Sequence, residues 1–325
     1  MEKVNKTNLD LINDCDNFPR PDLHSTAYTT TLSGLYTLRV ADHPTPVGLL
    51  LPHVAETLHG LPSWHLSPST RTLTLAASPP TERARTAAVA QTTAAMRATG
   101  HFAVLRAWRD ELYSVYGARG ELLFAIERAA SPLFGVVVCS VNMTCYLKNE
   151  GGFRFWVPRR ARAKQTYGGM LDNSVAGGLP AGERPMDALV REAEEEASLP
   201  GALVRRRARA GGCVSYFLVR DEMAGGETGL LQPEAQFVYD LELREGEGVV
   251  PAPRDGEVEG FELMGTEEVR EALRRGEFKP NTALVMLDFF VRHGVLTPEN
   301  EPDYVEIVAR LHRRLPFPGP RRPGF

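Results

Sequence analysis

The chain has 325 residues, which is enough for two domains that each bury a core of their own. Its hydrophobic content of 43% and charged content of 24% are ordinary for a globular protein, and its net charge of −4 argues against nucleic acid and anionic membrane surfaces as partners. The four cysteines form no Cys-x-x-Cys pair, which argues against a zinc site and favours reduced thiols.

The N-terminal segment gives an expectation about location. Residues 1–19 mix acidic and basic side chains and lack the apolar core of a secretory signal, while their acids argue against a transit peptide. No apolar run in the chain approaches the length of a membrane span. We therefore expect a cytoplasmic protein without membrane contact, with the nucleus as the second compartment to consider.

Residues 1–128 are predicted to form a smaller α+β domain of uncertain role. The segment 47–58 changes from strand or loop to helix, and 71–77 alternates like a strand. Residues 78–100 have a serine cap, prolines in the first turn and a terminal glycine, which are helix start and stop signals. Residues 111–130 indicate a strand, a turn and a connection to the next block.

From residue 129 to 315 the pattern changes to strands around one central helix, 185–198, followed by further helices. The predicted strands are 134–148, 151–160, 170–178, 212–220, 235–244 and 257–264, and the predicted C-terminal helices are 266–278, 281–294 and 301–315. This order predicts an α/β sandwich. Residues 316–325 are rich in proline and glycine, and we expect them to form a flexible tail.

The central helix carries an unusual concentration of acid in REAEEEASLP, residues 191–200. Like charges three or four positions apart repel one another on a helix. At 3.6 residues per turn Glu192, Glu195 and Glu196 share one sector, apart from the apolar stripe that faces the core. That stripe consists of Met186, Leu189, Val190, Ala193 and Ala197. Because carboxylates are the hard oxygen ligands that Mg²⁺ and Mn²⁺ prefer, the three glutamates predict a divalent metal site.

The spacing around this helix resembles the Nudix box, G-x5-E-x7-R-E-U-x-E-E-x-G-U, in which U is a bulky aliphatic residue. The matching residues are Gly177, Glu183, Arg191, Glu192, Glu195, Glu196 and Leu199. Two positions depart from the pattern, since Ala193 is small and Ser198 replaces the last glycine, so that Pro200 and Gly201 are expected to end the helix. The resemblance implies a Nudix α/β/α sandwich with a mixed sheet and a metal-dependent hydrolase of diphosphates linked to another group.

The resemblance also implies roles for the matching residues. Glu192, Glu195 and Glu196 would bind metal, and Arg191 would pair with Glu183, with Gly177 giving the tight turn. The metal would screen the diphosphate and activate a water, and a carboxylate would act as general base. For the base, Glu195 and Glu192 are both candidates. In DGEVEGFELM, Glu257 is a third candidate, ahead of Glu259.

The flanking sequence resembles one Nudix branch of fungi and plants, which includes the Nudix part of fungal thiamine pyrophosphokinase fusions. The matching stretches are YGGMLDNSVAGGLPAGERPMDALVREAEEEASLP, LDLINDCDNFP, PVGLLLPHVAETL, FAVLRAWRDELYSVYG and RAASPLFGVVVCSVNMTCY. The resemblance implies an activity on oxidised or otherwise damaged thiamine diphosphate, such as the oxo- and oxythiamine forms, which would be cut to the monophosphate. A bulky aromatic head group needs an apolar pocket with a few hydrogen-bonding groups.

The substrate-binding candidates flank the box. They are Trp156, Arg159, Gln165, Tyr167 and Asn173, with Arg160, Asn142 and Tyr146 as weaker options. The alternatives are a Nudix pyrophosphatase for ADP-ribose, a nucleotide sugar or a dinucleotide, an isomerase of the same fold, and a non-catalytic ligand-binding scaffold. An isomerase of this fold needs further His and Cys residues at its metal and catalytic sites, and these cannot be identified in this sequence. The carboxylates retained in the box argue against the non-catalytic scaffold. A homodimer is an open possibility.

Overall fold

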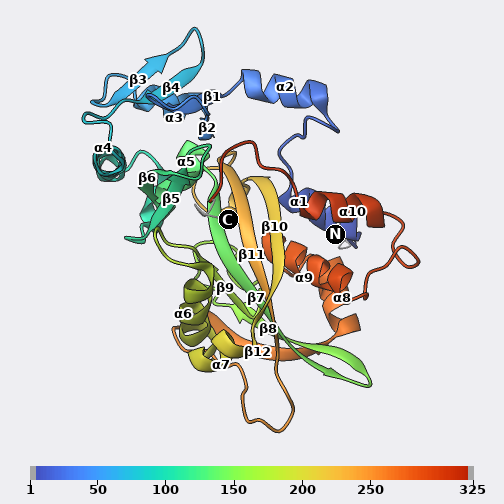
Figure 1. Cartoon of the computed structure of the whole chain (residues 1–325). Coiled ribbons are helices and arrows are strands. Elements are labelled where there is room, and N and C mark those ends of the chain that lie inside the picture. The colour runs from blue at the N-terminus through green and yellow to red at the C-terminus, as the bar shows by residue number, and fades with distance from the viewer. Residues whose placement is uncertain (1–4, 321–325) are drawn as a thin grey trace.

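The computed structural model describes residues 5–320, and within that range the strands form three sheets, all visible in Figure 1. The first sheet has the order β2-β1-β4-β3, the second is the hairpin β5-β6, and the third has the order β10-β11-β7-β8-β12 with β9 beside β7. In the first two sheets the strands are β1 Tyr36–Val40, β2 Gly48–Leu50, β3 Trp64–Ser67, β4 Thr72–Leu75, β5 Leu112–Tyr116 and β6 Leu122–Glu127. In the third they are β7 Val138–Asn149, β8 Gly152–Arg160, β9 Val175–Gly178, β10 Arg209–Val219, β11 Leu231–Glu242 and β12 Val258–Gly265.

The helices cover both faces of the third sheet and one side of the first two. They are α1 Asn8–Cys15, α2 Ser25–Ser33, α3 Pro52–Thr57, α4 Glu82–Thr99, α5 Ser131–Phe134, α6 Pro185–Ala197, α7 Gly201–Arg207, α8 Thr266–Arg274, α9 Pro280–Arg292 and α10 Tyr304–Leu311. Three 3₁₀ turns join them, η1 Ala103–Ala107, η2 Arg128–Ala130 and η3 Glu222–Ala224. None of the helices in the part of the chain that the structure describes is long and apolar enough to cross a membrane.

The third sheet is the centre of an α/β/α sandwich, as the sequence predicts. β7 and β11 run parallel, while the other pairs in this sheet are antiparallel, so the sheet is mixed. Successive side chains of a strand point to opposite faces. On β7, Val141 and Met143 therefore pack under α6, whereas Tyr146 packs on the other face with α9. Figure 1 shows α6 and α7 on one side of this sheet and α8 and α9 on the other.

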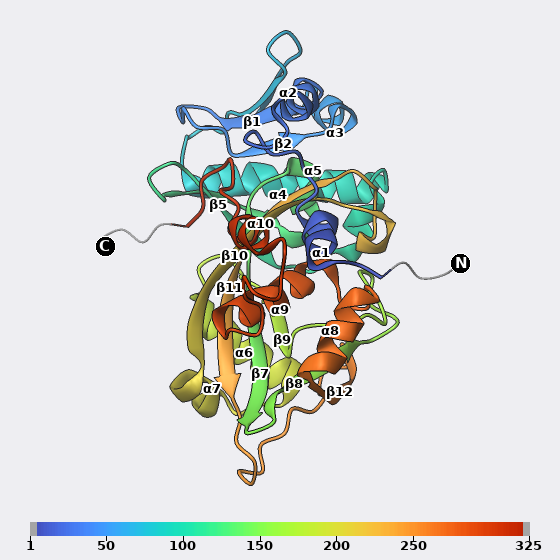
Figure 2. The same ribbon diagram turned by 90° about the vertical axis from the view of Figure 1, so that its right-hand side faces the viewer.

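The N-terminal residues do not all pack with the N-terminal sheets. Leu11, Ile12 and Cys15 of α1 are buried in the same apolar cluster as α9 and α10, beside the third sheet. Figure 2 shows α1 and α10 below the first sheet, next to the upper end of the third. The predicted boundary at residue 128 therefore does not divide the chain into two separately packed parts, because α1, from the first part, packs with helices of the second.

One further expectation is corrected at an element end. α4 begins at Glu82 with Thr81 as its cap rather than with a serine cap at 78, since the Thr81 side chain accepts the N–H of Ala84 and the prolines lie outside the helix. In the expected flexible tail, Phe317 packs against the apolar cluster that contains Phe18 and Phe217, and the flexibility of the tail stays a prediction. The remainder of that tail, 321–325, lies outside the described residues.

Candidate active site

The loop between β9 and α6 brings the backbone of the sheet edge against the acidic helix. A Cβ at Gly177 would overlap the carboxylate of Glu192, so this close approach requires glycine. α6 starts at Pro185, where the missing N–H would have no helical partner in any case. Its predicted apolar stripe is buried at Leu189 and Ala193, which fixes the acidic sector at the edge of the sheet.

The end of α6 differs from the expectation. Ser198 itself adopts the left-handed conformation, with φ of 54°, and the N–H of Leu199 bonds the carbonyl of Ala193 at 3.0 Å. Serine thus occupies the place of the usual glycine at some conformational cost, and Gly201 starts α7 instead of ending α6.

Arg191 is the centre of the charged network on this helix. Its guanidinium donates to both carboxylate oxygens of Glu183, at 3.3 and 3.0 Å. It also donates to Glu192 at 2.8 Å and to Glu195 at 3.2 Å. Five N–H donors in a planar fork allow one arginine to bind several carboxylates. Arg191 therefore neutralises part of the negative charge for which the sequence predicts a divalent cation.

The two inner carboxylates carry perturbed pKa values. Burial and the neighbouring Glu192 raise the pKa of Glu196 to about 8, although the N–H of Ala176 bonds one of its oxygens at 3.0 Å. Burial also raises the pKa of Glu192, against the lowering effect of Arg191. Two partly buried carboxylates that repel each other form an all-oxygen donor set, and a divalent cation would relieve the repulsion. Glu192 and Glu196 therefore fit Mg²⁺ or Mn²⁺.

The third predicted metal ligand is arranged differently. The side chain of Glu195 is 53% exposed and turns toward Arg191, while Glu196 is directed inward toward β9. Within residues 5–320 no three Asp, Glu, His or Cys side chains are gathered into a ready-made metal site. The expectation that the three carboxylates converge within one turn is corrected accordingly, because Glu195 turns outward to Arg191 while Glu196 accepts the N–H of Ala176.

A cavity of about 180 Å³ lies beside this helix, between the N-terminal sheets and the third sheet. Ala176, Gly177 and Gly178 of β9 form one of its edges. The N-terminal wall of the cavity is attached to the loop that follows β9, because the N–H of Ala181 bonds the carbonyl of Leu112 at 2.7 Å. A single opening therefore adjoins the acidic helix and both parts of the chain.

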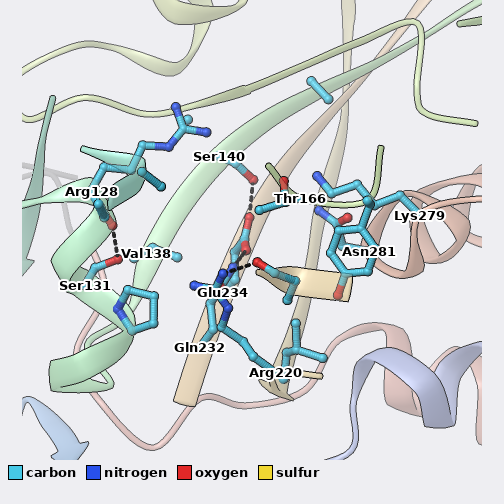
Figure 3. A pocket seen from close by; sticks show the side chains of 18 of the residues that line it. Arg128, Ser131, Val138, Ser140, Thr166, Arg220, Gln232, Glu234, Lys279 and Asn281 are labelled. Carbon is cyan, nitrogen blue, oxygen red and sulfur yellow. Dashed lines mark hydrogen bonds between the residues drawn. The ribbon is translucent and has the colours of Figure 1, made fainter. Parts of the chain in front are cut away.

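The lining of the cavity combines cations with polar strand residues. Arg128 and Ser131 lie on one side of Glu234, and Lys279 and Asn281, at the start of α9, lie on the other (Figure 3). Arg128 donates to Glu111 at 2.9 Å and is close enough to Glu192 to lower its pKa. Burial lowers the pKa of Lys279, whose side chain makes no hydrogen bond or ion pair with the residues that the structure describes. Anionic groups would be attracted to this end.

The floor of the cavity is a set of polar side chains on adjacent strands. Glu234 accepts hydrogen bonds from Ser140 at 2.7 Å, Tyr216 at 2.6 Å and Gln232 at 2.9 Å. Gln236 and Asn142 lie on the same face of the sheet and also line the cavity.

Of the predicted substrate residues, Gln165 and Tyr167 line this cavity, and so does the weaker candidate Asn142. Trp156, Arg159 and Asn173 do not. Trp156 points to the α6 face of the sheet, because it alternates with the buried Phe155.

The other two are placed by local contacts. Arg159 donates to the carbonyl of Gly169 at 3.1 Å and lies 3.7 Å from Glu262, so it braces the loop 161–170. Asn173 is 3% exposed, just before β9, and does not reach the cavity. Of the weaker options, Tyr146 is in the core against Phe289, and Arg160 is engaged with Asp172 at 2.5 Å.

Glu257 lies close to the candidate site but is bound by cations. It pairs with Lys164 and lies 3.7 Å from Arg109 of the N-terminal part. Burial alone would raise the pKa of Glu257, but Lys164 and Arg109 outweigh it and the pKa is lowered. The charge of Lys164 also lowers the pKa of Glu196, against the raising effect of burial. Glu259 instead binds the N–H of Arg162 at 3.0 Å at the surface.

Apart from Asn142, which was named as a weaker option, the polar residues of the cavity floor were missed from the sequence, although a signal was present. Polar residues alternate along two otherwise apolar strands, as Ser140 and Asn142 on β7 and as Gln232, Glu234 and Gln236 on β11. A period of two marks one face of a strand, so a polar face on a buried strand indicates a polar cavity. Arg128 and Lys279 carried no such signal.

Comparison with known families fits this geometry. The family described as NUDIX domain matches residues 140–284, which include β9, the acidic helix and the cavity floor. The chain contains a NUDIX domain. A second family, described as a domain of unknown function, DUF4743, matches residues 11–138, and so it supplies the opposite wall of the cavity beside the NUDIX domain.

Three related proteins match most of the present chain. An uncharacterized protein of Saccharomyces cerevisiae is 41% identical over 220 residues, which are 66% of this chain and 64% of that protein. Nudix hydrolase 20, chloroplastic, of Arabidopsis thaliana is 37% identical over 245 residues, which are 75% of this chain and 61% of the relative. Nudix hydrolase 24, chloroplastic, of the same plant is 36% identical over 74% of this chain and 62% of its own length. The matched stretches thus span less than two thirds of these relatives.

Proposed function

We propose that this protein is a metal-dependent Nudix hydrolase that cleaves a diphosphate linkage. The observation that carries the proposal is the junction of the acidic helix with the interdomain cavity, where Gly177 contacts both. A substrate can place its diphosphate at Glu192 and Glu196 and its head group in the cavity.

The charged residues have separate tasks in this proposal. Glu192 and Glu196 would hold Mg²⁺ or Mn²⁺, with Glu195 joining them after a rotation away from Arg191. A bound divalent cation supplies charge neutralisation of the diphosphate and a more acidic water. Arg191 fixes the loop through Glu183, and Arg128 and Lys279 attract the phosphate oxygens.

The general base stays a choice among Glu195, Glu192 and Glu257. Glu195 is more exposed than Glu192, the other candidate in the box, so it has access to a water. Glu257 is kept ionised by Lys164 and Arg109, which makes it a weaker base but a stable one. Separate substitution of Glu195, Glu192 and Glu257 distinguishes them, because loss of the general base lowers kcat.

For the substrate we propose oxidised or damaged thiamine diphosphate, including the oxo- and oxythiamine forms, which would be converted to the monophosphate. The support is the likeness of the flanking sequence to the branch described above, together with the cavity itself. At about 180 Å³ it suits one head group rather than a whole dinucleotide.

The small-molecule diphosphate is the partner that this proposal requires. A homodimer and a cytoplasmic location remain predictions, to be checked by light scattering and by imaging.

The test is a substrate panel. The full chain is incubated with Mg²⁺ or Mn²⁺ and with thiamine diphosphate, oxythiamine diphosphate, ADP-ribose or NADH, and monophosphate release is measured. We expect the oxythiamine form to be cleaved with the highest kcat/KM. Preference for ADP-ribose would replace the substrate claim, and inactivity with every compound would remove it. Undiminished cleavage by the double variant Glu195→Gln and Glu196→Gln would remove the mechanism.

A further inference from the structure

Two buried carboxamides face the cavity with hydrogen-bonding capacity unused. Gln236 is 0% exposed, and neither its Nε2 nor its Oε1 has a hydrogen-bond partner among residues 5–320. Asn142 is 1% exposed, and its Oδ1 is likewise without a partner there. The amide nitrogen of Asn142 makes one long contact of 3.4 Å to Ser140. Buried amides are rarely left in this state in folded proteins.

The sheet register places the two amides together. Gln236 on β11 is the partner of Ser140 on β7, and Asn142 lies two residues further along β7 on the same face. Adjacent strands lie about 4.8 Å apart and residues two positions apart on a strand lie about 7 Å apart, so the two side chains reach a common space. Both residues line the same cavity, so their free atoms are available to one ligand.

The polar groups around them are already engaged with one another. The hydroxyls of Ser140 and Tyr216 and the amide of Gln232 all donate to Glu234. Glu234 is thereby fixed. The network is complete without Gln236, and Asn142 joins it only through the long contact of its amide nitrogen to Ser140.

We propose that Gln236 and Asn142 form a head-group subsite that binds the hydrogen-bonding edge of a planar nitrogen heterocycle carried by the diphosphate. This inference rests on the proposed function. A carboxamide presents a donor and an acceptor side by side, which matches an amino group next to a ring nitrogen or an oxo group next to a ring N–H. The amide of Gln236 can rotate to present either order, so this subsite binds the aminopyrimidine and the oxo form alike. Discrimination between those forms must come from other residues of the cavity.

The variant Gln236→Met tests the subsite because it keeps the side-chain length and removes both polar atoms. Thr144→Val is the matched control. Thr144 lies on the same face of β7 and is 2% exposed, and its hydroxyl is also without a partner within the described residues, but it does not line the cavity. Removing an unpartnered buried polar group should leave stability equal or higher in both variants.

The readouts are the urea midpoint, the KM and kcat for thiamine diphosphate and oxythiamine diphosphate, and the dissociation constants of free thiamine and oxythiamine by calorimetry. We expect Gln236→Met to raise KM and both dissociation constants about tenfold or more, to a similar degree for the two heterocycles, with kcat within about threefold. Thr144→Val should bind and turn over as wild type. Asn142→Leu should weaken binding in the same direction.

The outcomes separate this inference from the proposed function. Binding of both heterocycles that depends on Gln236, without hydrolysis of their diphosphates, would support the subsite and overturn the function. Hydrolysis with unchanged KM and dissociation constants in Gln236→Met would overturn the subsite and leave the function. A wild-type protein that binds neither heterocycle would overturn the subsite. A less stable Gln236→Met that binds normally would show that the amide serves packing with internal water, which also overturns it.

Discussion

The two polar edges of the cavity satisfy their side chains in opposite ways. At the β9–α6 edge each charge has a partner, since Arg191 binds three carboxylates and Ala176 binds Glu196. On the sheet floor, Gln236 and one oxygen of Asn142 have none among the described residues. A buried charge without a partner costs far more than a buried amide without one. At the β9–α6 edge the fold therefore holds its charges in place by itself, while the neutral amides of the sheet floor can be kept free for a ligand.

The largest expected effect comes from the paired edge. Glu196→Gln keeps the shape of the side chain and removes the charge, so we expect kcat/KM to fall roughly 10³-fold, as for other groups that stabilise charge in a transition state. Activity is measured with excess Mg²⁺. Glu194→Gln is the control on the same helix, since within residues 5–320 its carboxylate accepts only the N–H of Gly201 and an amide oxygen can do the same. Equal losses in both would mean that helix integrity, and not the ligand set, is being measured.

A smaller loss is expected where the backbone meets the acidic helix. A methyl group at Gly177 would displace Glu192, so Gly177→Ala should lower kcat/KM roughly 10²-fold, as expected when a catalytic group moves by about 1 Å. Gly260→Ala is the control, because open space surrounds that position and its backbone is not left-handed. Wild-type activity in Gly177→Ala would show that Glu192 tolerates displacement and that the close approach is only structural.

The contribution of the N-terminal wall should be smaller again. Arg128→Gln removes a cation that faces the cavity, and we expect KM for a diphosphate substrate to rise roughly tenfold, the effect of losing one charge-assisted contact. Arg119→Gln, an arginine of the same region with a side chain that is 88% exposed, should change nothing. If the two variants behave alike, the N-terminal region closes the cavity without contacting the substrate.

The smallest effect is expected from a residue that the sequence favoured. Trp156→Phe should leave KM within about twofold, because the indole lies on the α6 face and not in the cavity. The lost contacts should lower the free energy of unfolding by about 1 kcal/mol in a urea titration. A large rise in KM with unchanged stability would instead return Trp156 to the substrate site.

Local spacing was sufficient to predict the motif helix, because helical geometry sets the neighbours within a few turns of one chain segment. The resemblance to the Nudix box predicted the ion pair of Arg191 with Glu183, which lies before that helix. The same reasoning failed for Glu195, since the direction of its side chain depends on competition for Arg191. It also failed for Asn173, which is close to the motif in sequence but is buried away from the cavity.

The mixed α/β class, the NUDIX domain and the acidic helix follow from the amino-acid sequence, because short-range periodicity and fixed spacing encode them. The cavity depends on long-range packing. Ser140 and Glu234, 94 positions apart, meet through the parallel pairing of β7 and β11, and Arg128 lies close enough to Glu192 to lower its pKa because the N-terminal region packs on the loop after β9. Such contacts arise from the register of distant strands and from the packing of two regions, and no local pattern in either segment specifies the other.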